Sequence, residues 1–247
     1  MVDAQAPLVA QTKSVIGLME ATEFDPKECL SRAQGLIREF KLNLPKKIYA
    51  ADLSVKSKIP FKAVPLREVL LYRLTELAEV ACMLYEENRI VSAFIMTRCV
   101  METVAMLYWL YKRIEQVVQS NDLGDMDTFL MRAMFGWRDD SMPAQAFNIL
   151  KAIDQMDKQF PSYRALYDSL SEFTHPNWSG VHGAYARIDK ENFAEDLGPE
   201  FTEPPLVIGL LPLATSLEAF KFYYNKLSDM FPAFIKICDA DIDKKNI

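Results

Sequence analysis

The sequence predicts an all-α fold, and three observations carry that prediction. Apolar residues recur every three or four positions along most of the chain, as they do on the buried face of an amphipathic helix. Only 8 of the 247 residues are glycine, whereas a β-rich chain needs turn glycines at short intervals. Breaks rich in proline, asparagine and aspartate separate the apolar stretches. These patterns indicate a helical bundle of roughly six or seven helices around a four-helix core.

Residues 1–64 are predicted to form an N-terminal helical arm and an irregular connection. Residues 3–22 have weak helical character. Asp25-Pro26 is a helix start signal, because proline suits the first helical turn. The helix that follows places Leu30, Ala33, Ile37 and Phe40 on one stripe. Residues 41–64 contain two prolines and are predicted to be irregular.

Residues 65–237 are predicted to form the bundle itself. Pro65 opens one helix, and the short polar break at Glu86-Glu87-Asn88 indicates an antiparallel pair with the next. The later helices are expected at 90–118, 126–135, 144–158, 163–173 and 210–237. The segment 177–209, rich in glycine and proline, is predicted to be irregular, with a short strand or extended arm at 181–188. Residues 238–247 are expected to be a frayed tail.

The charge balance argues against one class of function. The formal net charge is −6, and no run of lysine and arginine marks a basic face that would grip a nucleic-acid backbone. Strong non-specific nucleic-acid binding is therefore not expected. The four cysteines form no CxxC pair, which is typical of small buried thiols in a reducing compartment. The start of the chain lacks a signal-peptide pattern, and we expect a cytoplasmic protein.

The stretch 90–112 is long and apolar, and Arg98 and Glu102 are its central charges. Charges at that depth are costly in lipid, so we expect a buried helix of a soluble bundle and no membrane association. The two residues are four apart and face the same way. A charge in a bundle core must be paired or face a cavity. Two interpretations stay open: an ion pair that fixes helix register, or a pocket lining that presents arginine to an anionic group.

The stretch SEFTHPNWSGVHGAY, residues 171–185, holds both histidines of the chain. Tyr167, Ser171 and His175 repeat every four residues and form one polar stripe that ends before Pro176. Histidine titrates near neutrality, so His175 suits a general base or acid. At a helix C-terminus it is equally suited to a plain electrostatic cap. The sequence leaves both roles open.

Metal and cofactor sites are not expected. His182 follows His175 by seven residues, but the acidic residues nearby have no recognised ligand spacing. The chain contains no Walker loop, GxGxxG, GxSxG, HExxH or CxxC motif. Trp109, Trp137 and Trp178 are interpreted as packing residues rather than as a platform for stacked bases.

Two segments resemble a known family. RCVMETVAMLYWLYKR (98–113) and YRALYDSLSEFTHPNWSG (163–180) resemble an uncharacterised prokaryotic helical family with an Arg-x-x-x-Glu step and a later His-Pro or His-Ser loop. That family is similar to the HEPN (higher eukaryote and prokaryote nucleotide-binding) domains, which are four-helix bundles. The resemblance spans roughly residues 65–235. It implies a dimeric protein of a stress, defence or toxin–antitoxin setting.

The same resemblance implies an alternative activity. Many HEPN proteins are metal-independent ribonucleases, with an arginine four to six residues before a histidine. His175 matches that histidine, but residues 169–171 are Ser-Leu-Ser, and the nearest upstream arginine is Arg164. This departure weakens the ribonuclease interpretation. In that interpretation His175 moves the proton, Arg98 offsets charge on the phosphorane, and Ser171 and Asn177 orient the histidine or phosphate.

The leading expectation is therefore a HEPN-like binding protein for a small anionic or nucleotide-like ligand, or for a protein partner. The predicted catalytic residues of the ribonuclease alternative are His175 and Arg98. A non-catalytic structural interaction module is the second alternative. The predicted ligand-binding residues are Arg98, Glu102, Tyr167, Ser171 and Asn177.

Overall fold

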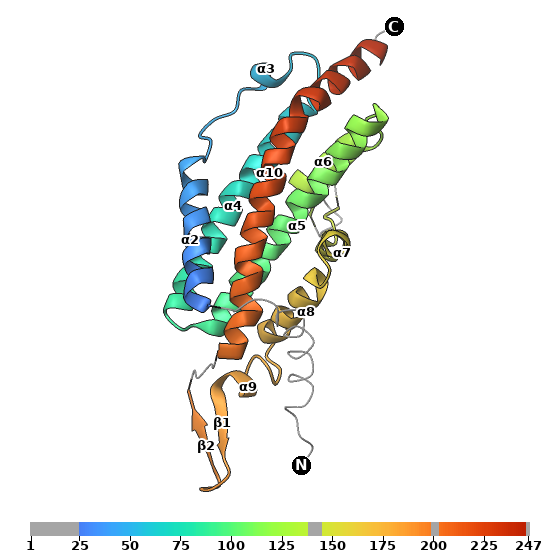
Figure 1. Cartoon of the computed structure of the whole chain (residues 1–247). Helices are drawn as coiled ribbons and strands as arrows, with labels where there is room; N and C mark the ends of the chain where they lie inside the picture. The colour runs from blue at the N-terminus through green and yellow to red at the C-terminus, as the bar shows by residue number, and fades with distance from the viewer. Residues whose placement is uncertain (1–24, 138–144, 199–202, 246–247) are drawn as a thin grey trace.

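The protein is a bundle of long helices with a small hairpin at one end, in a computed structural model that describes residues 25–137, 145–198 and 203–245 (Figure 1). The longest helices are α4 (Pro60–Glu86), α5 (Ile90–Ser120) and α10 (Glu203–Lys245), which lie side by side. On one side, α2 (Pro26–Leu42) packs on α4 and α10. The predicted all-α bundle is confirmed at this level.

Three shorter helices lie on the other side of the bundle (Figure 1). They are α6 (Met126–Phe135), α7 (Ile149–Gln159) and α8 (Tyr163–Thr174). The backbones of α7 and α8 pack on α5, whereas that of α6 packs mainly on α4. The predicted helix at 126–135 is thus confirmed to the residue, and the predicted one at 163–173 ends one residue later.

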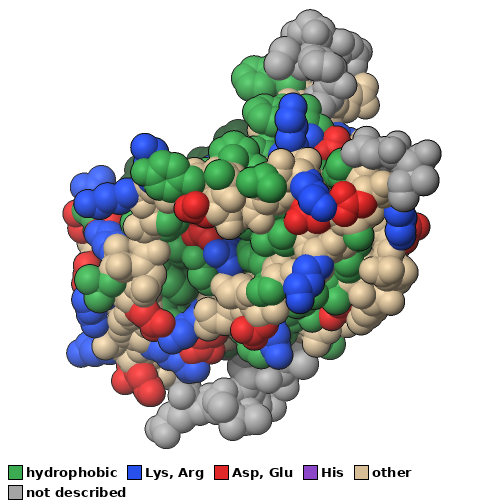
Figure 2. All heavy atoms as spheres, turned by 90° about the horizontal axis from the view of Figure 1, so that it is seen from above, with side chains coloured by type: hydrophobic (Ala, Val, Ile, Leu, Met, Phe, Trp, Pro, Cys, Tyr) green, Lys and Arg blue, Asp and Glu red, His purple; other side chains and the backbone are tan. Residues whose placement is uncertain are grey.

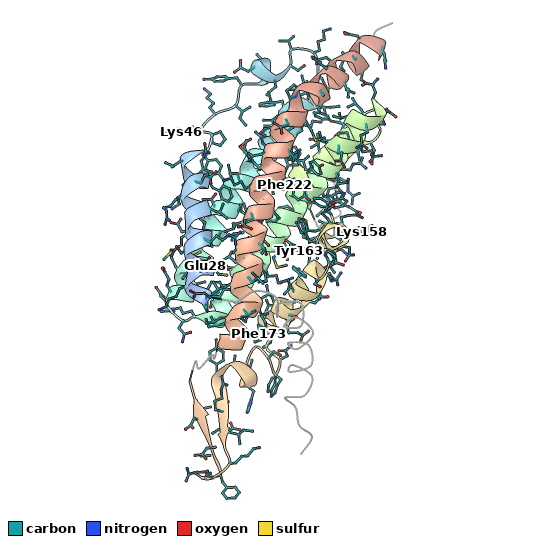
Figure 3. The ribbon with its side chains drawn as sticks, in the orientation of Figure 1. Glu28, Lys46, Lys158, Tyr163, Phe173 and Phe222 are labelled. Carbon is teal, nitrogen blue, oxygen red and sulfur yellow. The ribbon has the colours of Figure 1, made fainter. Side chains whose placement is uncertain are left out.

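The core is centred on α5, which packs on α4, α7, α8 and α10. Its residues Met101, Val104, Leu107 and Leu110 have no exposed side-chain surface. Burying a side chain of this size contributes about 1.5 to 3 kcal/mol, so the whole bundle depends on this helix. Figure 3 labels Phe173 on α8, whose ring lies edge-on to Phe94 of α5, with the ring centroids 5.0 Å apart.

The helix ends follow the local signals in the sequence. Asp25 caps α2, and its side chain accepts a hydrogen bond from the backbone N–H of Lys27 at 2.8 Å. Asn88, between α4 and α5, and Asn121, after α5, both have a left-handed backbone with φ near 55°. Asparagine tolerates this conformation better than most residues, so the breaks predicted from polar residues are real helix ends.

Three predicted helix starts were wrong. The helix expected at 144–158 begins only at Ile149, where Asn148 caps it. Pro60, not Pro65, occupies the first turn of α4, and Pro65 lies inside the helix. Proline's fixed φ is compatible with a helix at the cost of one backbone hydrogen bond. The last helix begins at Glu203 rather than near residue 210. A short helix, α3 (Ala50–Leu53), also interrupts the predicted irregular connection.

The predicted frayed tail was wrong as well, because α10 continues through Lys245. Cys238 has no exposed surface in this part of the helix. Lys56 forms an ion pair with Asp243 at 2.8 Å, and Ser54 donates a hydrogen bond to Asp239 at 2.5 Å. These contacts from the chain around α3 hold the last turns of α10 in place.

A hairpin projects from the end of the bundle that is lowest in Figure 1. It follows the short helix α9 (His182–Tyr185) and consists of β1 (Ala186–Asp189) and β2 (Ala194–Leu197). The strands are antiparallel, and Ala186 lies opposite Leu197. The expected strand over 181–188 is therefore only partly correct. Every residue of β2 is exposed. A strand without a buried face needs no alternation of apolar and polar residues, so the sequence of β2 carries no such signal.

Two helices, α5 and residues 206–244 of α10, are long and apolar enough to cross a membrane. Inside the bundle, 56% of the most apolar window of α5 and 61% of that of α10 are buried. Core helices of soluble bundles have the same length and apolarity. Figure 2 shows acidic and basic side chains interspersed on the end of the bundle that is uppermost in Figure 1. The cytoplasmic location remains a prediction.

We predict that Gly209→Ala lowers the free energy of unfolding by about 2 kcal/mol. A β-carbon at Gly209 of α10 would lie 2.1 Å from the Tyr85 hydroxyl and 2.5 Å from the Phe94 ring. Gly35→Ala in α2 is the matched control, since its nearest neighbour would be an arginine tip at 3.9 Å. That change should stabilise by about 0.5 to 1 kcal/mol through helix propensity. Urea unfolding of both variants measures the difference, and equal effects would contradict this packing.

Candidate functional site

Arg98 and Glu102 form an ion pair on α5, with 3.4 Å between Arg98 Nη2 and Glu102 Oε1. Tyr167 of α8 joins them. Its hydroxyl accepts a hydrogen bond from Arg98 Nη2 at 2.6 Å and donates one to Glu102 Oε1 at 2.7 Å. The Arg98 guanidinium also lies over the Tyr167 ring, 4.8 Å from its centroid. The three side chains therefore form a closed polar junction between α5 and α8.

The protonation of Tyr167 suits this role. Burial, with the hydrogen bond to Glu102 as the next cause, raises the pKa of Tyr167 to about 12. The hydroxyl thus keeps its proton at neutral pH and can donate to Glu102 while it accepts from Arg98. Arg98 Nε has no partner among the described residues, but it is fully buried, so a ligand oxygen could reach it only if the junction opened. The geometry favours the ion pair that fixes helix register over an open pocket lining.

Ser171, the next residue of the predicted stripe, is used within its own helix. Its hydroxyl donates to the backbone carbonyl of Tyr167 at 2.8 Å. Asn177 donates to Glu172 at 2.9 Å and accepts from the backbone N–H of Gly180 at 3.1 Å. Both side chains therefore stabilise the end of α8 and the loop behind it.

His175 is exposed at the C-terminal end of α8, with an extended backbone, as expected for a residue before proline. No hydrogen bond or ion pair joins its ring to another described residue, Arg98 included. The second histidine, His182, lies 3.3 Å from Glu195 of the hairpin. Among the described residues no group of three or more histidines, cysteines or acids is placed to hold a metal ion.

A cavity of about 200 Å³ lies elsewhere, between α5, α6 and the start of α7. Its apolar wall consists of three aromatic rings: Trp109 from α5, Phe129 from α6, and Phe147 just before α7. The Trp109 and Phe147 ring centroids are 4.6 Å apart, and those of Phe129 and Phe147 are 5.2 Å apart. These separations are typical of stabilising aromatic pairs, so the wall is a well-packed surface.

Three cations and one carboxylate surround this aromatic wall. Arg132 lies over the Phe147 ring at 4.3 Å, and Arg113 lies over the Phe129 ring at 5.4 Å. Lys151 lines the cavity from the first turn of α7. The acid is Asp125, which pairs with Arg113. In a chain with net charge −6, this is a local excess of positive charge.

The N-terminus of α7 adds to the positive potential of the cavity. Asn148 caps the helix, and its side chain accepts from the backbone N–H of Leu150 at 3.0 Å. The partial positive charge of a helix N-terminus favours anions. Arg132 donates to the Gln145 backbone carbonyl at 3.1 Å, a neutral acceptor, and no carboxylate among the described residues pairs with it. The cavity combines a flat apolar wall with groups that attract an anion.

The sequence reasoning missed this cavity. It assigned Trp109 to packing, and it did not single out Arg113, Arg132 or Lys151. These residues come from three helices whose relative position no local pattern specifies. The available signal was weak: Trp109 and Arg113 are four residues apart on one helix face.

Comparisons of this chain with protein-family models, with curated proteins and with solved structures found no match. The similarity to HEPN domains therefore stays a prediction, and the functional argument depends on the geometry described above.

We predict that Tyr167→Phe lowers the free energy of unfolding by about 1 to 2 kcal/mol, because it removes two hydrogen bonds to charged groups and keeps the ring. Tyr185→Phe is the matched control, since Tyr185 is exposed and no hydrogen bond of its hydroxyl is found in the described structure. Thermal and urea unfolding measure the difference. An unchanged stability of Tyr167→Phe would show that the junction does not hold α8 on α5.

Proposed function

We propose that this chain is a ligand-binding helical protein that takes a small, ring-bearing anion in the cavity between α5, α6 and α7. The observation that carries the proposal is the meeting of three aromatic rings and three cations around one cavity in an acidic protein. This agrees with the ligand class expected from the sequence but moves the binding site away from Arg98, Glu102 and His175.

The chemistry of the wall determines the kind of ligand. A flat ring can stack on Trp109 or Phe147 and bury apolar area, which drives binding. An anionic group on the ring would meet Lys151 and Arg132, where it is stabilised by charge-assisted hydrogen bonds. A cavity of about 200 Å³ has room for one ring and its substituent. It suits a small molecule better than a nucleic-acid strand.

Two parts of the proposal depend on the resemblance alone: the HEPN-like class of the bundle and the stress or defence setting. In this interpretation the Arg98–Glu102–Tyr167 junction is structural, and the protein binds without catalysing a reaction. A homodimer is compatible with this proposal but is not required by it, because every group of the cavity comes from one chain.

We predict that Lys151→Ala weakens binding of a ring-bearing anion about fivefold, the effect of losing roughly 1 kcal/mol from a partly exposed charge contact. Lys158→Ala is the matched control, because Lys158 is also an exposed lysine of α7 but does not line the cavity (Figure 3). Calorimetric titration measures the binding of phenyl phosphate and of benzoate. Quenching of tryptophan fluorescence is a second, independent measurement of the same binding. No binding of either probe to the wild type would refute the proposal.

The alternative, a metal-independent ribonuclease, has one observation in its favour. His175 is exposed at the end of α8 and its ring is free of hydrogen bonds within the described residues, so it is available for proton transfer. No described arginine or lysine is bonded to it. The phosphate would therefore need charge from another source, such as a second copy of the chain.

On the proposed binding function, we expect no RNA cleavage that depends on His175. Purified wild type, His175→Ala and His182→Ala are compared on structured and single-stranded RNA in the presence of EDTA. His182 is the matched control because it is the other histidine of the same segment and pairs with Glu195. Cleavage by the wild type and His182→Ala, but not by His175→Ala, would establish the ribonuclease instead.

A further inference from the structure

Asp125 is the residue that decides the net charge of the cavity. It stands at the N-cap of α6, where an aspartate normally accepts a hydrogen bond from a backbone N–H of the first turn. Asp125 makes no such bond. Its carboxylate instead pairs with the Arg113 guanidinium, although its side chain is 71% exposed and free to turn toward either partner.

The other two cations of the cavity have no acidic partner in the part of the chain that the structure describes. Neither Arg132 nor Lys151 forms an ion pair with a described carboxylate, and among these residues Arg132 donates to the Gln145 backbone carbonyl. Among the described lining residues, three cations and one carboxylate thus leave a surplus of two positive charges. A single carboxylate on a ligand would neutralise one of them and leave the other uncompensated.

We infer that the ligand carries a dianionic phosphate monoester on its ring, and that Asp125 sets this preference by neutralising Arg113. This inference rests on the function proposed above, and it names the ligand class. A phosphate monoester bears a charge of about −1.5 to −2 at neutral pH and offers three acceptor oxygens. It therefore matches the surplus charge, and it can accept from Lys151 and Arg132 at the same time.

A test follows because Coulomb energy scales with the charge of the ligand. A substitution that changes the charge of the cavity changes the dissociation constant of a monoanion by some factor. It should change the dissociation constant of a dianion by about the square of that factor. The preference is measured as the ratio of the benzoate dissociation constant to that of phenyl phosphate. Inorganic phosphate is titrated as well, because it separates the contribution of the anionic group to the affinity from the contribution of the ring.

We expect wild type to prefer phenyl phosphate about tenfold. Asp125→Asn raises the cavity surplus to three charges and should raise the ratio about threefold, while asparagine keeps the ability to cap α6. Lys151→Ala lowers the surplus to one charge and should lower the ratio by a similar factor. The matched control is Asp127→Asn, which removes the same charge two residues away, where Asp127 pairs with Lys62 outside the cavity.

The outcomes distinguish the phosphate inference from the proposed binding function. Equal affinities for the two ring anions, or a ratio that Asp125→Asn leaves unchanged, would overturn the phosphate inference and leave the proposed binding function standing. Failure of both ring anions to bind wild type and Asp125→Asn would overturn both claims. Inorganic phosphate that binds as tightly as phenyl phosphate would overturn the role of the ring. Phosphotyrosine in a short peptide, if it binds at least tenfold more tightly than phenyl phosphate, would identify a protein as the source of the same group.

Discussion

The bundle depends on the burial of α5. This helix packs on four others, and a run of its side chains has no exposed surface. A helix that is apolar on almost every side makes few directional hydrogen bonds with its neighbours. Apolar packing alone therefore allows it to slide along them or rotate against them. The Arg98–Glu102 pair and Tyr167 restrict that freedom, since their hydrogen bonds form in only one register of α5 against α8. A polar junction in a helical core therefore supplies specificity more than stability.

A second junction of the same composition joins α4 to α10. Glu68 is 5% exposed, and it pairs with Arg67 and accepts a hydrogen bond from the Tyr224 hydroxyl at 2.7 Å. The Arg67 guanidinium lies 4.2 Å from the Tyr224 ring centroid. An arginine, a glutamate and a tyrosine thus recur at two helix interfaces, and in both the tyrosine hydroxyl donates to the glutamate while the guanidinium lies over the tyrosine ring. The bonding differs in one respect, because Arg67 donates to Glu68 and Ser228, whereas Arg98 donates to the Tyr167 hydroxyl. Since Glu68 of the second junction is almost fully buried, the recurrence supports a structural role for the junction at Arg98.

The sequence predicted the helices and part of this junction, and physical reasons explain what it could not predict. Helical periodicity and polar breaks are local signals, so α6 was correct to the residue and α5 nearly so. The spacing of Arg98 and Glu102 predicted that they face the same way, with an ion pair as one of two open interpretations, but the third partner, Tyr167, lies 65 residues away from Glu102. The continuation of α10 to Lys245 depends on distant contacts from Ser54 and Lys56. The cavity depends on three helices at once, and no pattern along one helix encodes their relative position.

The position of the cavity follows from the unequal lengths of the helices. At 1.5 Å per residue the 31 residues of α5 span about 46 Å, whereas α7 and α8 have 11 and 12 residues and cover only part of it. Arg98, Glu102, Trp109 and Arg113 fall within about 60° of one another around α5, at 100° per residue, so one stripe serves both regions. Its first half meets α8 and is closed by Tyr167. Its second half, with Trp109 and Arg113, lines the cavity between α6, which packs mainly on α4, and the start of α7, which packs on α5. The junction between these short helices is therefore where the bundle can hold a ligand without disturbing its core. Arg132 and Lys151, which have no carboxylate partner among the described residues, lie at this junction.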